Sequence, residues 1–183
     1  MRNLVIVLMM ASILIMSSCE KVELNSVAQD ELELKSGKKV LNFRTHLSGD
    51  NEVPSAETMA TGQAIFQLNK EGSELSYKLI VSNIENVRMA HIHKGAAGVN
   101  GSVVAWLYPD GPPPVKIPGK FNGILAEGVL TESSLVGPLA GMTMEDLINE
   151  MQTGNTYVNV HTDQYPGGEV RGQIKGNMPM GGY

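Results

Sequence analysis

From residue 41 onward, apolar and polar residues alternate with a period of two, in short stretches separated by Gly, Pro, Asn and Asp. In the first stretch, residues 41–47, Leu41, Phe43, Thr45 and Leu47 share one face and polar residues occupy the other. Alternate side chains of a β-strand point to opposite faces, so the pattern indicates a half-buried strand. Repeated about seven to nine times, it predicts an all-β fold, an antiparallel Greek-key β-sandwich.

The remaining stretches complete this prediction. Strands are expected at 61–69, 75–81, 102–108, 121–130, 156–162 and 169–174, with another carrying His91 and His93 after a turn at 83–86. One short helix is expected near 143–152, where Thr143 and Asp146 have the spacing of a capping box and Gly154 ends the segment. The folded domain is therefore predicted to span 40–175, with a frayed tail at 176–183.

The N-terminal segment is predicted to be a targeting signal. Arg2 precedes a largely apolar run at 4–16, which is too short to span a bilayer. Ser17, Ser18 and Cys19 then resemble the cleavage site of a bacterial lipoprotein, in which the cysteine is lipidated. The alternative is an ordinary secretory signal followed by an incidental thiol. Residues 1–18 are thus expected to be removed, which leaves a protein anchored in the cell envelope, at the outer membrane.

Residues 19–39 lack aromatic side chains and mix charges with isolated apolar residues, so we expect a flexible tether behind the lipidated Cys19. Because Cys19 is the only cysteine, the domain has no intrachain disulfide and must be stabilised by its core. The net charge is −5, with no cluster of Lys or Arg, which argues against nucleic acid as a partner. The expected partners are the membrane and an extracytoplasmic protein or glycan.

Three of the four histidines are candidate metal ligands. His91 and His93 share one face of a predicted strand, with Cα atoms roughly 6–7 Å apart, and His161 lies in a strand of the same pattern. If these strands are close, the three imidazoles can converge on one copper or zinc ion. His46 falls on the polar face of the first strand and is expected to face solvent.

An alternative interpretation involves no metal. The histidines would then be hydrogen-bonded polar residues at strand ends, with Asp163 or Glu169 orienting a ring. Asp163 would equally suit a metal site, as a residue that fixes an imidazole tautomer. Glu169 and Arg171 are expected on the outward face of the last strand, as an exposed ion pair that contributes ~0–1 kcal/mol. No nucleophile–base set or paired carboxylates stand out, so no catalytic residue is predicted.

Several motifs resemble the CHRD domain, named from chordin and also present in exported bacterial proteins. They are LSGDNEVP at 47–54, ATGQAIF at 60–66, AHIH at 90–93, YVNVHT at 157–162 and PGGEVRGQ at 166–173. The resemblance covers about residues 41–174, and its last motif is the most specific. It implies an antiparallel β-sandwich and placement outside the cytoplasm. It implies no established activity.

A looser resemblance is to copper–zinc superoxide dismutase, in which a His-x-His strand, a Gly-rich loop and a later histidine strand form the copper site. By that resemblance the sandwich would be of the superoxide dismutase or immunoglobulin type, His91, His93 and His161 would match copper ligands, and Arg171 would match the anion-steering arginine. The sequence departs from this family in lacking the bridging histidine, the zinc cluster and the cysteine pair. Two hypotheses follow: a lipid-anchored, non-catalytic binding or adhesion module, and a histidine metal site, structural or redox.

Overall fold

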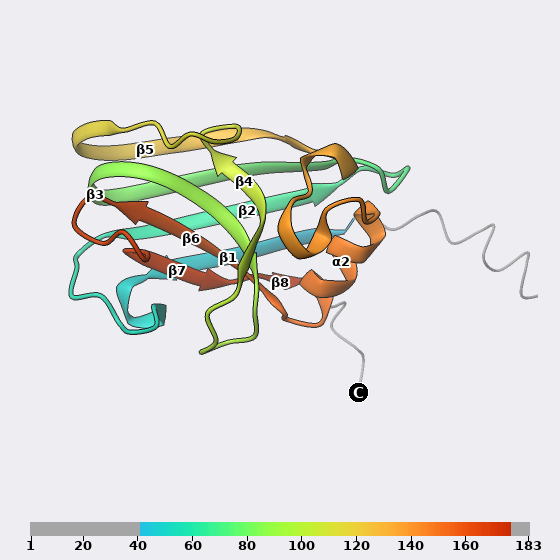
Figure 1. Ribbon diagram of the computed structural model, residues 1–183, viewed down its shortest axis with the longest axis horizontal. Helices are drawn as coiled ribbons and strands as arrows, with labels where there is room; N and C mark the ends of the chain where they lie inside the picture. Colours follow the sequence, from blue (N-terminus) through green and yellow to red (C-terminus); the bar gives the residue numbers. More distant parts are fainter. Residues whose placement is uncertain (1–40, 177–183) are drawn as a thin grey trace, which may run out of the picture. The chain divides into compact units, whose positions relative to one another are not determined.

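The structure, a computed structural model, describes residues 41–176 and consists mainly of β-strands (Figure 1). The predicted signal at 1–18, the predicted lipidation at Cys19 and the predicted tether at 19–39 lie outside these residues, as does the predicted tail at 176–183 apart from Gly176. The strands are β1 (Asn42–Ser48), β2 (Thr61–Leu68), β3 (Leu75–Lys94), β4 (Ser102–Tyr108), β5 (Ile117–Leu130), β6 (Thr156–Thr162), β7 (Val170–Gln173) and β8 (Lys175–Gly176). The helical segments are η1 (Gly49–Asn51), η2 (Glu132–Ser134), η3 (Gly137–Leu139) and α2 (Met144–Gln152).

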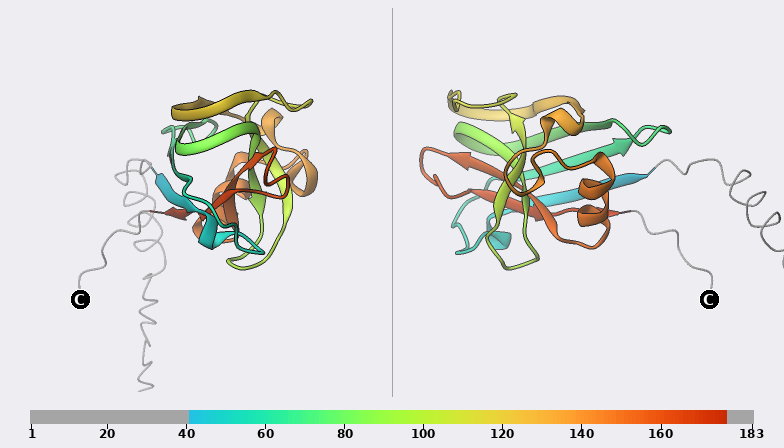
Figure 2. Two further views of the ribbon diagram at one scale, coloured as in Figure 1. Left: turned by 90° about the vertical axis from the view of Figure 1, so that its left-hand side faces the viewer. Right: turned by 45° about the vertical axis from the view of Figure 1, so that its right-hand side comes forward.

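The strands form one antiparallel sheet that closes on itself. Its order is β2-β1-β7-β6-β3-β4, β5 pairs with β3, and β2 pairs with β3 as well as with β1. A ring of hydrogen-bonded strands therefore runs from β1 through β2, β3, β6 and β7 back to β1, and Figure 2 shows these strands curving around one interior. The expected all-β antiparallel fold with one short helix is confirmed.

The long strand β3 differs from the sequence-based expectation. A turn was predicted at 83–86, but the chain continues as a bulged strand through this segment. Asn83 and Asn86 adopt φ values of 56° and 53°, and the register with β5 shifts on both sides of Glu85. Asparagine tolerates this left-handed conformation better than most residues, so the two positions bend the strand without ending it. The bend lets β3 pair with β2 in its first half and with β6 in its second.

The interior of the closed sheet is apolar. It is filled by the inward side chains of every long strand, among them Phe43, Phe66, Leu79, Ile92 and Val158, each at most 1% exposed. Helix α2 begins at the predicted capping box of Thr143 and Asp146 and packs its buried residues against this core. Burying large apolar side chains supplies the main stabilising free energy of a domain without disulfides.

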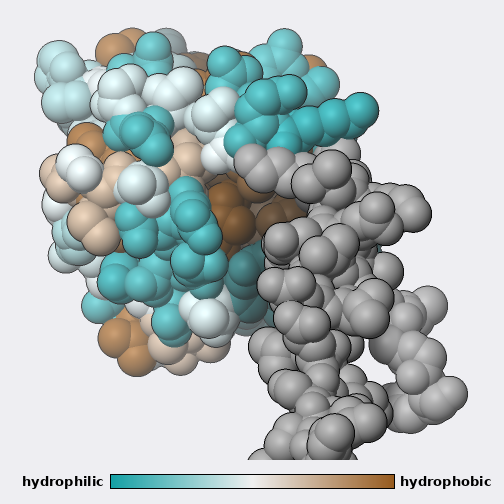
Figure 3. All heavy atoms as spheres, turned by 90° about the vertical axis from the view of Figure 1, so that its right-hand side faces the viewer, coloured by the Kyte–Doolittle hydropathy of each residue, from teal (hydrophilic) through white to brown (hydrophobic). Residues whose placement is uncertain are grey.

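The outer surface of the domain carries both hydrophilic and hydrophobic residues. The end of the molecule that carries α2 is mostly hydrophilic around a small hydrophobic hollow (Figure 3). A cavity lined by Leu41, Leu68 and Ile148 lies between α2 and the loop at 69–73, and no histidine contributes to it. Among residues 41–176, no helix is long and apolar enough to cross a membrane.

Candidate metal centre

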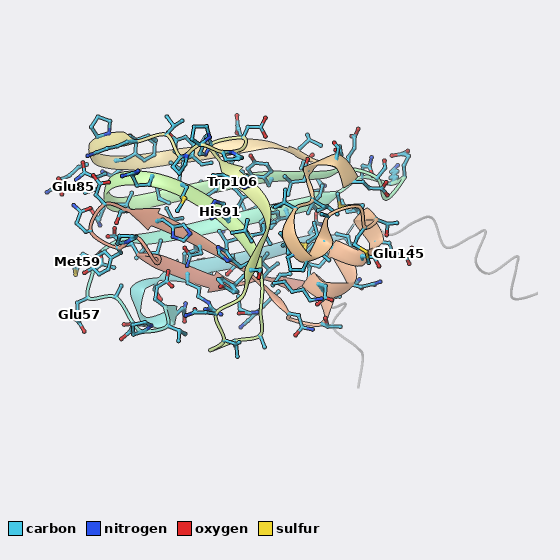
Figure 4. The ribbon with its side chains drawn as sticks, viewed as in Figure 1. Glu57, Met59, Glu85, His91, Trp106 and Glu145 are labelled. Atoms are coloured by element: carbon cyan, nitrogen blue, oxygen red, sulfur yellow. The ribbon has the colours of Figure 1, made fainter. Side chains whose placement is uncertain are left out.

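The three histidines occupy the outer face of β3 and β6. These strands are antiparallel neighbours in which Met89 pairs with His161, His91 with Asn159 and His93 with Tyr157. The alternating residues between them, Ala90, Ile92, Val158 and Val160, point into the core and are fully buried. The period of two thus forces both histidines of β3 and the histidine of β6 onto the same face. Figure 4 shows His91 beside Trp106, away from the α2 end where Glu145 is labelled.

The imidazole rings converge as the strand geometry predicted. One ligand nitrogen from each of His91, His93 and His161 lies within 4.8 Å of those of the other two. Nδ1 of His91 and Nε2 of His161 are 3.2 Å apart. Two nitrogens bound tetrahedrally to one ion at 2.0–2.1 Å are separated by about 3.3 Å, so this pair has the spacing that a shared metal requires.

Backbone carbonyl groups fix the tautomers of two rings. Nδ1 of His93 lies 3.0 Å from the carbonyl oxygen of Gly101, and Nδ1 of His161 lies 2.9 Å from that of Pro166. A carbonyl oxygen only accepts, so Nδ1 carries the proton in both rings and Nε2 carries the lone pair. Metal-binding histidines are usually oriented in this way, by a hydrogen bond from the ring nitrogen that does not bind the metal.

Two ring nitrogens of these histidines lack a hydrogen-bond partner among residues 41–176. Nε2 of His91 and Nε2 of His93 are buried and make no hydrogen bond, although the residues are only 2% and 8% exposed. A buried polar atom without a partner costs roughly 1–3 kcal/mol. Nε2 of His93 is thus available to an ion, whereas His91 presents its other ring nitrogen, Nδ1, beside Nε2 of His161.

Burial also keeps the rings neutral. It lowers the pKa of His91 to about 3, helped by the neighbouring His161 and His93. It lowers the pKa of His161 to about 4, although the hydrogen bond to Pro166 acts in the opposite direction. The pKa of His93 is lowered by burial and by the positive charge of Arg171, against the hydrogen bond to Gly101. Neutral imidazole is the form that binds metal ions, so protons do not compete for these sites at neutral pH.

Aromatic side chains and one arginine enclose the rings. The ring of His93 stacks on that of Tyr157, with the ring centres 4.8 Å apart. The ring of His91 meets that of Trp106 edge-on, with the ring centres 4.2 Å apart. The guanidinium carbon of Arg171 lies 3.4 Å from the centre of the Tyr157 ring. The Tyr157 hydroxyl accepts a hydrogen bond from the backbone N–H of Gly101, so the ring also supports the loop that orients His93.

Arg171 and Glu169 are not the exposed ion pair that the alternation predicted. Arg171 is 1% exposed, and its guanidinium donates to the carbonyl oxygens of Ala96 and Val99 and to Oδ1 of Asn100. Glu169 is 5% exposed and accepts from the hydroxyl groups of two threonines, Thr58 and Thr162. The prediction was wrong because loops, with no periodicity of their own, cover this polar face of β7.

Asp163 does not contact the histidines through any described hydrogen bond. Its two carboxylate oxygens accept from Arg88 and Lys116 at the surface, and these bonds lower its pKa. The carbonyl oxygen of Pro166 takes the orienting role that Asp163 or Glu169 was expected to play for His161. His46 is exposed on β1, as expected, and takes no part in the cluster.

A buried Glu–Asn pair lies beside the histidine strands and was not predicted from the sequence. Glu52 is 6% exposed, and both its carboxylate oxygens accept from Nδ2 of Asn159, at 3.0 and 3.1 Å. Burial raises the pKa of Glu52 to about 7, although Arg171 and these hydrogen bonds lower it. Asn159 lies on the strand pair that carries the histidines, and its buried Oδ1 has no hydrogen-bond partner in the part of the chain that the structure describes. The motif at 47–54 contained Glu52, but turn chemistry alone gave no reason to bury a carboxylate there.

Comparison with protein families matches residues 43–174 to the CHRD domain. The chain belongs to the CHRD domain family. No curated protein and no solved structure matched it significantly. The matched range begins in β1 and ends directly after β7, so the CHRD domain includes the closed sheet, the three histidines and the loops that cover them.

This CHRD domain departs from the superoxide dismutase pattern in its arginine as well as in its ligand set. Arg171 was expected, by that resemblance, to steer anions. Its buried guanidinium is instead bonded to the loop at 96–100, which leaves it without the exposed position that anion steering needs. The fourth histidine, His46, lies on β1 away from the cluster and cannot bridge a second metal.

Proposed function

We propose that this CHRD domain binds one transition-metal ion, copper or zinc, through His91, His93 and His161. The observation that carries the proposal is the convergence of three buried, neutral imidazoles from two neighbouring strands. Neutral imidazole suits both metals, and three histidines leave a further coordination position open, as in catalytic zinc sites.

The tautomers of His93 and His161 also support metal binding. In His93 and in His161, Nδ1 donates a hydrogen bond to a backbone carbonyl oxygen. Nε2 of each ring therefore carries the lone pair that can bind a metal ion. The partner of Nε2 of His161 is Nδ1 of His91, 3.2 Å away. A metal ion bound by both nitrogens and by Nε2 of His93 would satisfy three lone pairs at once.

Metal binding to the purified chain tests the proposal. After removal of metals with a chelator, dialysis against Zn²⁺ or Cu²⁺ should load about one ion per chain, and the melting temperature should rise because the ion binds only the native state. At a free metal concentration 100 times the Kd, the gain is about 2.7 kcal/mol. The double variant His91→Gln/His93→Gln should lose both effects, whereas His46→Gln, a substitution of the exposed histidine, should keep them. A wild-type chain that stays metal-free with an unchanged melting temperature would refute the proposal.

A second candidate function is a non-catalytic binding or adhesion module anchored in the cell envelope through Cys19. It is supported by the sequence pattern that predicts a signal at 1–18 and a tether at 19–39, and by the CHRD family membership. The two functions are compatible, since a metal site can stabilise a binding module. Mass spectrometry of the mature N-terminus should find a diacyl or triacyl mass on Cys19, and a mature chain with an unmodified cysteine would reject the anchor.

A further inference from the structure

A methionine lies beside the three histidines. Met89 precedes His91 by two residues on β3, so both side chains are on the outer face of the sheet. In the register of β3 and β6, Met89 pairs directly with His161. Side chains at directly opposed positions have Cβ atoms roughly 4.5–5.5 Å apart, well within the reach of a methionine.

The thioether and the imidazole border the same space. A cavity of about 170 Å³ is lined by Met89 and His161 together with Pro166, whose carbonyl oxygen orients the His161 ring. Arg88 and Asp163 also line it, and their side chains are 46% and 32% exposed. The cavity therefore extends from His161, one of the three histidines, to residues in contact with solvent. Met89 itself is half-buried, so its side chain is neither packed in the core nor free in solvent.

The chemistry of this fourth side chain discriminates between metals. A thioether is a soft ligand, which suits Cu(I), whereas Zn²⁺ sites in proteins are built from imidazole, thiolate and carboxylate groups. We propose that Met89 is a fourth ligand of the histidine centre and makes it a copper site that favours Cu(I). This inference rests on the proposed metal-binding function and adds to it the identity of the metal.

Paired affinity measurements on the full chain test the inference. Cu(I) affinity is measured by competition with a chromophoric Cu(I) chelator under anaerobic reduction, and Zn²⁺ affinity by competition with a zinc chelator. Met89→Leu, which keeps the size and removes the sulfur, should weaken Cu(I) binding by about tenfold or more and change Zn²⁺ binding little. Met59→Leu is the matched control, because Met59 is 83% exposed. X-ray absorption of the Cu(I)-loaded wild-type chain should show one sulfur in the first coordination shell, a readout that needs no variant to fold.

The measurements distinguish failure of the Met89 proposal from failure of the metal-site proposal. Equal Cu(I) affinity in the wild type and in Met89→Leu, or a first shell of nitrogen and oxygen without sulfur, would overturn the role of Met89 and leave the three-histidine site in place. A wild-type chain that binds neither Cu(I) nor Zn²⁺ would overturn the metal site itself, and the role of Met89 with it.

Discussion

Nδ1 of His91 and Nε2 of His161 lie 3.2 Å apart, although the two residues are separated by 70 positions in the sequence. The contact exists because β3 and β6 pair along their whole shared length and the rings project from one face. Without a metal, one proton on Nδ1 of His91 can link the two nitrogens, and Nε2 of His91 then remains a buried acceptor without a partner. An ion in place of that proton leaves Nε2 of His91 free to carry a proton instead.

Arg171 is predicted to hold the loop at 95–101 in place. Arg171→Ala should destabilise the domain by about 3 kcal/mol, because three acceptors lose their donor and the Tyr157 ring loses its cation. Denaturant unfolding measures the loss, and hydrogen exchange should quicken at 96–101. Arg44→Ala, at an exposed position on β1, should change stability by no more than about 0.5 kcal/mol. Equal effects of the two substitutions would contradict the role of Arg171.

Two adjacent glycines in the PGGEVRGQ motif, Gly167 and Gly168, are predicted to differ sharply in how well they tolerate substitution by alanine. A Cβ at Gly168, where φ is +134°, would meet the amide of Asn159 at 2.3 Å and Oε1 of Glu52 at 2.5 Å. A Cβ at Gly167 would meet nothing within 4 Å. Gly168→Ala should therefore lower the melting temperature by several degrees, at a cost of roughly 2 kcal/mol or more, while Gly167→Ala should be nearly neutral. Scanning calorimetry on both variants is the measurement, and indistinguishable melting temperatures would show that the Glu52–Asn159 contact is not rigid.

Glu52 is predicted to make stability depend on pH in an unusual direction. Its pKa is raised from 4.5 to about 7, so the native state binds the proton more tightly than the unfolded chain does. The stability contributed by this group is full below pH 4.5 and is lost as the pH rises towards 7. Relative to the wild type, Glu52→Gln should gain roughly 2–4 kcal/mol between pH 4.5 and pH 7.5.

Urea unfolding at a series of pH values, with Glu57→Gln as the control in the same loop, measures this difference. Glu57 is exposed, so its substitution should leave the pH profile close to that of the wild type. A Glu52→Gln profile parallel to the wild-type profile would show that the carboxylate is solvated in solution.

The sequence was informative wherever periodicity determined the structure. Alternation along β6 placed Tyr157, Asn159 and His161 on one face, and the capping box at Thr143 located the start of α2. Prediction from the sequence failed where a loop covers the polar face of a strand. Glu169 and Arg171 alternate like surface residues, yet the segments around η1 and after β3 bury them. These covering segments have the composition of turns and show no periodicity. Their packing against the sheet depends on tertiary contacts, which a local sequence pattern does not predict. The burial of Glu52 depends on the same contacts.

The most direct measurement of the metal site is anomalous diffraction from a crystal of the chain grown with Zn²⁺ or copper. Data collected on both sides of the metal absorption edge locate the ion independently of any assumption about its ligands. We predict one peak, about 2.0–2.1 Å from Nδ1 of His91, Nε2 of His93 and Nε2 of His161. A peak at His46 or Asp163 instead, or three ordered rings with no peak between them, would contradict the account.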